Sequence, residues 1–105
     1  MQTLLLLDNE PDIKKVGKVF RAIDHPLRKK ILKLLEEKQP AKVTDIYVNL
    51  RIEQSVASQH LKILRECKIV ETERKGRSIL YKPNYNTLTK LEKIVSQIVT
   101  EIVSD

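Results

Sequence analysis

Apolar residues near the start of the chain lie three or four positions apart: Ile13, Val16, Phe20 and Ile23. This spacing predicts a helix over residues 9–24 with a single apolar face. Asp8 or Asn9 is expected to cap it, because short polar side chains accept hydrogen bonds from the first free amides of a helix.

A second helix is expected from Pro26, with apolar positions at the same spacing: Leu27, Ile31, Leu34 and Leu35. Asp24 or His25 is predicted to be its N-cap, and Pro26 suits the first helical position, where no amide hydrogen is needed. Polar residues 36–40 end this helix, and a brief strand is expected at residues 41–43.

Two shorter helices are predicted between residues 44 and 66. The first is expected to have Thr44 as its N-cap. Three of its side chains are expected to point toward the core: Ile46, Tyr47 and Leu50. The second turns four residues toward the core: Val56, Ala57, Leu61 and Leu64. Two such helices joined by three or four residues form a helix-turn-helix. Because the link has no glycine, Asn49 or Arg51 must adopt the turn conformation.

After Lys68 the period of the pattern changes from 3.6 to 2. Residues 69–74 and 78–82 are therefore predicted to be strands, joined by a turn at residues 75–77 that contains a glycine. A β-hairpin that follows a helix-turn-helix is the arrangement of a winged helix. The predicted fold class is mainly α with a small β-hairpin, a winged helix-turn-helix whose wing is formed by residues 69–82.

The last predicted helix runs from about residue 85 to 103. Its apolar residues are spaced three, four, three and four positions apart: Leu88, Leu91, Val95, Ile98 and Ile102. A helix this apolar needs a cover, which is either its own domain or a second copy of the chain. We expect a homodimer formed through the helices at residues 9–24 and 85–103.

The 105 residues fit a single domain, 1–105, with a formal net charge of +6. The positive charge is concentrated in the middle: residues 51–82 carry eight basic and four acidic side chains. This distribution favours an acidic partner such as double-stranded DNA. The single cysteine fits a reducing cytoplasm, and the leucine run at residues 4–7 is too short to span a membrane, so a cytoplasmic protein is expected.

The polar side of the helix at residues 54–65 carries amide, hydroxyl and ammonium groups: Gln54, Ser55, Ser58, Gln59 and Lys62. Such groups hydrogen-bond to base edges and phosphates, so we predict that this helix reads the major groove of DNA. The alternative is a polar surface helix that contacts nothing. His60 either reaches a phosphate or packs partly buried against the backbone.

Three cations surround Gly76 at the tip of the predicted wing: Arg74, Lys75 and Arg77. They are predicted to contact phosphates or to enter the minor groove, which adds affinity and salt dependence more than sequence choice. The alternative is a solvated basic turn.

Two segments resemble the ArsR/SmtB-type family of winged-helix transcriptional repressors. DHPLRKKIL at residues 24–32 resembles the family's His-Pro-x-Arg-x-x-Ile-Leu stretch, and QSVASQHLKILRE at residues 54–66 resembles its recognition helix. The resemblance spans roughly residues 16–83 and includes the wing. It implies a homodimer that binds a pseudo-palindromic operator, with recognition helices about 34 Å apart in successive major grooves.

Many members of this family sense metals, yet the ligands expected from that resemblance are missing. The helix before the recognition helix, where such sensors carry paired thiolates, has no cysteine, and residues 84–105 contain no histidine. We therefore predict no metal site and no cofactor, and the sequence identifies no effector. Cys67 is either a small buried hydrophobic residue or a redox switch.

Other functions have weaker support. No motif joins the cysteine and the histidines into a nucleophile–base pair, so an enzyme is not expected. A winged-helix module for protein–protein interaction, without specific DNA binding, is the main alternative. An RNA-binding winged helix is disfavoured because the basic region has few aromatic residues for base stacking.

Overall fold

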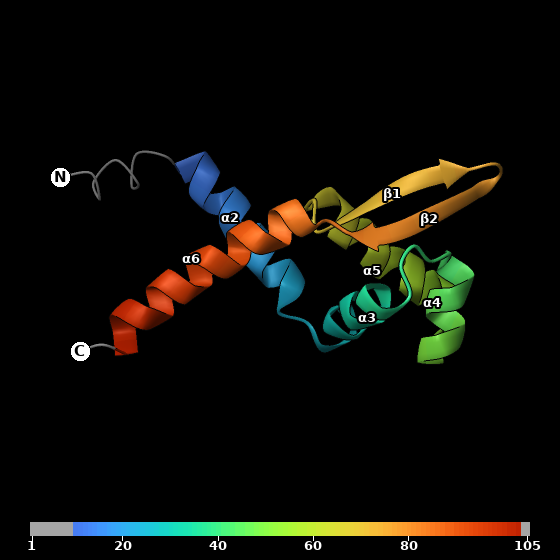
Figure 1. The fold of residues 1–105 in the computed structure, drawn as a ribbon, viewed down its shortest axis with the longest axis horizontal. Coiled ribbons are helices and arrows are strands. Elements are labelled where there is room, and N and C mark those ends of the chain that lie inside the picture. Colours follow the sequence, from blue (N-terminus) through green and yellow to red (C-terminus); the bar gives the residue numbers. More distant parts are fainter. Residues whose placement is uncertain (1–9, 104–105) are drawn as a thin grey trace.

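The structure is a computed structural model that describes residues 10–103 (Figure 1). The elements follow one another in this order: α2 (Glu10–Ile23), α3 (Pro26–Glu37), α4 (Val43–Leu50), α5 (Gln54–Glu66), β1 (Val70–Lys75), β2 (Ser78–Pro83) and α6 (Tyr85–Val103). The two strands form one antiparallel hairpin. The predicted winged helix-turn-helix is confirmed. The expected caps Asp8 and Asn9 and the leucine run at residues 4–7 lie outside the described residues.

The core is aliphatic and is built where α3, α4, α5 and the base of the hairpin meet. Its fully buried large side chains are Ile31, Leu35, Ile46, Leu61, Leu64, Ile69 and Val70. Burying each such side chain contributes about 1.5–3 kcal/mol to folding. Of the four residues predicted to face the core from α5, Ala57, Leu61 and Leu64 are buried and Val56 is half-buried. This core fixes α5 with its polar side turned outward.

His25 is the N-cap of α3. Of the two predicted caps, Asp24 and His25, the structure therefore selects His25. Its Nδ1 accepts a hydrogen bond of 3.2 Å from the backbone N–H of Leu27, and Pro26 occupies the first turn. The ring of His25 therefore satisfies one of the free amide groups in the first turn of α3.

The start of α4 differs from the prediction. Lys42, not Thr44, is the N-cap, and the carboxylate of Asp45 accepts a hydrogen bond of 3.1 Å from the Lys42 N–H. In a capping box, the side chain three positions after the N-cap accepts a hydrogen bond from the backbone N–H of the N-cap. Asp45 is in that position relative to Lys42, which makes Lys42 the N-cap. The expected strand at residues 41–43 is reduced to one bridge between Ala41 and Tyr81, because Lys42 and Val43 start the helix.

Arg51 supplies the turn between α4 and α5. Its φ angle is 55°, in the left-handed region, and its N–H bonds to the carbonyl of Val48 at 3.3 Å. The backbone N–H of Ile52 donates to the carbonyl of Tyr47 at 3.1 Å, which closes the end of α4. The side chain of Asn49 instead donates to the carbonyl of Asp45. Of the two candidates for the turn, the structure selects Arg51.

The hairpin has a well-defined register, in which Val70 pairs with Pro83 and Lys75 with Ser78. Gly76 adopts a φ of 65° at the tip, a conformation that a glycine takes without steric cost. Each strand lies within one residue of its prediction. β1 starts at Val70 because the N–H of Ile69 still bonds to the end of α5, at the carbonyl of Leu64.

Helix α6 has the predicted bounds and leaves the core after its first two turns. Leu88 is half-buried and Leu91 is buried, but every residue from 92 to 103 is exposed. Figure 1 shows α6 and α2 at the end of the molecule away from α4 and the wing tip. None of the helices in the described part of the chain is long and apolar enough to cross a membrane.

Candidate nucleic-acid interface

The five polar residues predicted to read DNA lie together on α5. All are exposed, on the side of the helix away from the core: Gln54, Ser55, Ser58, Gln59 and Lys62. Within residues 12–103, none of these side chains has a hydrogen bond or ion pair to another group of the protein. Their donors and acceptors are therefore available to a partner.

The wing presents its positive charge at the tip. Arg74, Lys75 and Arg77 are exposed, and the Nε–H of Arg74 donates to the carbonyl of Gly76 at 3.4 Å. At the base, by contrast, Lys82 forms ion pairs with Glu71 at 3.8 Å and with Glu73 at 3.6 Å.

The opposite charges at the base of the hairpin offset one another, whereas the side chains of Lys75 and Arg77 have no acidic partner in the described part of the chain. The tip is thus the part of the wing that is suited to a polyanion.

His60 lies apart from the exposed row on α5. It is half-buried against α3, and its Nδ1 accepts a hydrogen bond of 3.2 Å from Nε of Arg28. Its ring centroid is 4.7 Å from that of His25. The structure therefore places His60 in an interhelical contact, and its predicted contact with a phosphate stays a prediction.

Arg28 has a role that the sequence pattern did not predict. Besides the bond to His60, its Nη1 donates to the carbonyls of Ala22 at 3.0 Å and Arg21 at 3.4 Å, at the end of α2. A guanidinium at the free carbonyls of a helix C-terminus is favourable for both hydrogen bonding and the helix dipole. Arg28 thereby ties α2 and α5 to α3. One indication of this role is present in the sequence, which is that Arg28 and His60 lie in the two segments that resemble the family.

The pKa of His60 is lowered from its ordinary value, first by burial and then by the nearby His25 and Arg28. A folded state that binds the proton less readily than the unfolded chain loses stability as the pH falls. The contribution of His60 is complete above its ordinary pKa of about 6.5 and is lost as the pH falls through the lowered value.

We therefore expect the free energy of unfolding to decrease between about pH 7.5 and pH 5, where an unperturbed histidine becomes charged. Urea denaturation at both pH values measures this change. In the His60→Gln variant the same loss should be smaller, because glutamine does not titrate. Identical losses for the variant and the wild type would show that His60 is not the group responsible.

The described residues include no group suited to holding a metal ion. In the described part of the chain, no three His, Cys, Asp or Glu side chains come together to hold an ion. Cys67 is 8% exposed and packs in the core cluster as a free thiol. Zinc and soft metals require several nitrogen or sulfur ligands, which this arrangement does not offer.

Comparison with known proteins shows that the chain is similar to bacterial transcriptional regulators. Residues 25–72 match the family described as "Bacterial regulatory protein, arsR family". The chain is 36% identical over 73 residues to the transcriptional repressor SdpR of Bacillus subtilis, covering 70% of this chain and 80% of that protein.

Two solved structures have the same architecture. The crystal structure of Rv0081 from Mycobacterium tuberculosis matches with a TM-score of 0.67 and 27% identity, covering 90% of this chain and 95% of that one. The solution structure of the homodimeric winged helix-turn-helix DNA-binding domain of Mb0332 from Mycobacterium bovis matches with a TM-score of 0.71 and 24% identity, covering 88% and 84%.

Proposed function

The chain belongs to the arsR family of bacterial regulatory proteins, and on this premise we propose that it is a transcriptional repressor that binds a pseudo-palindromic operator as a homodimer. The observation that carries the proposal is the exposed polar row of α5, which has no partner within the described residues and lies on a winged helix with free cations at its wing tip. We place the protein in the cytoplasm, where it reaches chromosomal DNA.

In the proposed complex, α5 enters the major groove and its amides and hydroxyls read base edges. Gln59 suits adenine, whose N6 and N7 form a bidentate pair with an amide, and Ser58 can donate to or accept from several bases. Lys75 and Arg77 at the wing tip contact flanking phosphates. The base contacts would set the sequence, and the phosphate contacts would set position and salt dependence.

The proposed dimer covers the apolar part of α6. Apolar residues along this helix are exposed: Ile94, Val95, Ile98, Val99, Ile102 and Val103. On α2, Ile13 and Val16 are also exposed. The spacing of three and four along α6 is that of helices that pair with one another.

A second copy supplies a matching surface by two-fold symmetry, and Mb0332, a relative in fold, is described as homodimeric. Two-fold symmetry also matches the two halves of a palindromic site. Bound over a promoter, such a dimer would block access by RNA polymerase. Because the described residues contain no cluster of metal ligands, the proposal includes no metal-responsive switch.

Titration of the protein into labelled duplex DNA of arbitrary sequence tests the proposal. Fluorescence anisotropy at about 50 mM and about 200 mM salt should show binding that weakens by orders of magnitude at the higher salt, as counterions compete for the phosphates. Sizing should show a dimer. If no binding occurs even at low salt and the protein is a monomer, the repressor is ruled out in favour of the protein-interaction module.

A further inference from the structure

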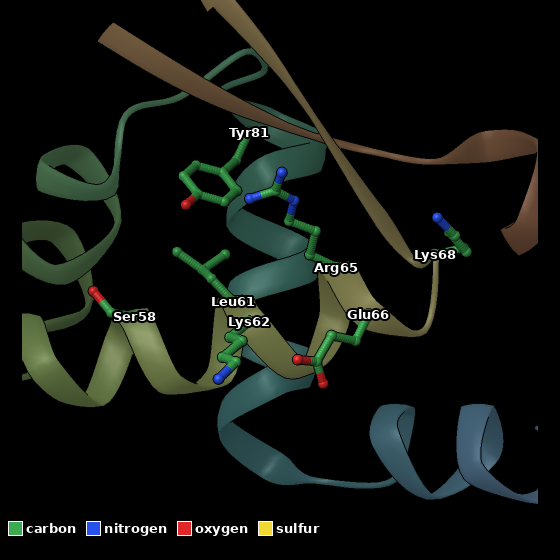
Figure 2. Close-up of a pocket in the computed structure, with 7 residues that line it drawn as sticks. All are labelled: Ser58, Leu61, Lys62, Arg65, Glu66, Lys68 and Tyr81. Carbon is green, nitrogen blue, oxygen red and sulfur yellow. The ribbon is translucent and has the colours of Figure 1, made fainter.

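An open cleft of about 400 Å³ lies at the junction of the recognition helix α5 and the hairpin (Figure 2). Leu61, which is buried, and the ring of Tyr81 give it an apolar wall. The polar residues along its rim come from α5, from the turn that follows α5 and from β2: Ser58, Lys62, Arg65, Glu66, Lys68 and Tyr81.

The cleft carries an excess of positive charge. Lys62, Arg65 and Lys68 are exposed, and within residues 12–103 none of them forms an ion pair. Glu66 is the only acid on the rim. In Figure 2 the Arg65 side chain extends toward the hairpin, whereas the Lys62 ammonium group and the Glu66 carboxylate point away from it. The Arg65 guanidinium is therefore left for an anion from outside the protein.

Two hydroxyl groups are also available in the cleft. The hydroxyls of Tyr81 and Ser58 make no hydrogen bond to the described part of the protein. The backbone of Tyr81 is held by paired hydrogen bonds with Ala41, of 3.0 Å and 2.7 Å, in addition to its pairing with Thr72 in the hairpin. Tyr81 thus presents a neutral donor from a fixed position next to the free guanidinium.

The cleft is continuous with the proposed DNA surface. Ser58 and Lys62 belong both to the cleft and to the exposed row of α5, and β2 leads from Tyr81 to the wing tip at Arg77. With α5 in a major groove and the wing tip on the flanking backbone, the intervening DNA strand must pass the mouth of this cleft.

We propose, on the basis of the function proposed above, that the cleft binds one backbone phosphate of the operator, with Arg65 as its main ligand and Tyr81 as a hydrogen-bond donor. Arginine binds phosphate through two parallel hydrogen bonds, and a phenol adds a neutral one. This phosphate contact fixes how far α5 enters the groove. It is independent of base sequence.

Arg65→Gln, Tyr81→Phe and Lys33→Gln test the proposal by anisotropy titration on operator and random duplexes over a range of salt. Lys33 is exposed on α3, so its variant matches the loss of charge at a site away from the cleft. Arg65→Gln should weaken binding to both duplexes by about tenfold and reduce the slope of log K against log salt by about 0.9. Tyr81→Phe should weaken both about threefold without changing the slope, because it removes an uncharged donor.

If Arg65→Gln behaves like Lys33→Gln, the cleft does not hold a DNA phosphate and the proposal is overturned. If the wild type fails to bind any duplex, the proposed function itself fails, so the two failures are distinguishable.

A second experiment titrates the protein with inorganic phosphate and with pyrophosphate in the absence of DNA. The NMR chemical shifts of Arg65 and Tyr81 report binding. Weak, non-saturating shifts agree with a site completed by duplex DNA, whereas saturation at micromolar concentration assigns the cleft to a free phosphorylated ligand and contradicts the proposal.

Discussion

Replacement of Ile98 by glutamate is expected to convert the protein to a monomer and to weaken binding to a palindromic operator by about a hundredfold or more, since the avidity of two linked sites is lost. Ile98 is 51% exposed and lies at the centre of the apolar surface of α6. In the proposed dimer its side chain becomes buried, and an unpaired carboxylate there would be costly. Analytical ultracentrifugation and operator titration measure the two effects.

The exposure of Ile98 makes this experiment interpretable, because the folded subunit does not depend on its side chain for its core. Circular dichroism should therefore show an unchanged helix content. Thr100→Glu is the matched control, since Thr100 is exposed one half-turn along α6 and outside the apolar stripe. The control should remain a dimer with nearly normal affinity. If Ile98→Glu also remains a dimer, the proposed interface is wrong.

Replacement of both Ser58 and Gln59 by alanine is expected to abolish most of the preference for operator over random DNA. Each good base contact contributes about 1–3 kcal/mol of discrimination, so operator affinity should fall by roughly ten- to a hundredfold or more. Binding to random duplex should change little, because phosphate contacts dominate it. Parallel anisotropy titrations with both duplexes measure the ratio.

The double variant Lys75→Ala and Arg77→Ala provides the contrast. It should weaken operator and random duplexes by similar factors and reduce the salt slope by about 0.9 for each phosphate that the wing no longer neutralises. All four residues are exposed, so neither variant removes core packing. If the two variants affect operator and random DNA in the same way, the division between base reading by α5 and phosphate binding by the wing is incorrect.

Much of the fold was predictable because hydrophobic periodicity reports which face of each element is buried. The bounds predicted for α6, residues 85–103, agree with the structure, and each end of the two hairpin strands lies within one residue of its prediction. The start of α4 was harder to predict from the sequence. It depends on the hydrogen bond from the Lys42 N–H to Asp45, and lysine is not a residue that sequence rules assign to an N-cap.

The exposed row of α5 followed from the same periodicity, since polar residues opposite a buried stripe must face outward. The role of Arg28 did not, because its partner His60 is 32 positions away and the contact arises only when α3 packs on α5. Tyr81 was missed for a similar reason. Its place beside Arg65 results from the register of the hairpin and its packing on α5, which no local pattern encodes.

Selection of bound sequences from a pool of random duplex DNA by the wild-type protein tests the central claim most directly. The proposed homodimer should enrich an inverted repeat whose half-site centres are separated by about one helical turn, roughly 10–10.5 base pairs. A pool that remains random after repeated rounds, or one that enriches a single site without two-fold symmetry, would contradict a dimeric, sequence-reading repressor.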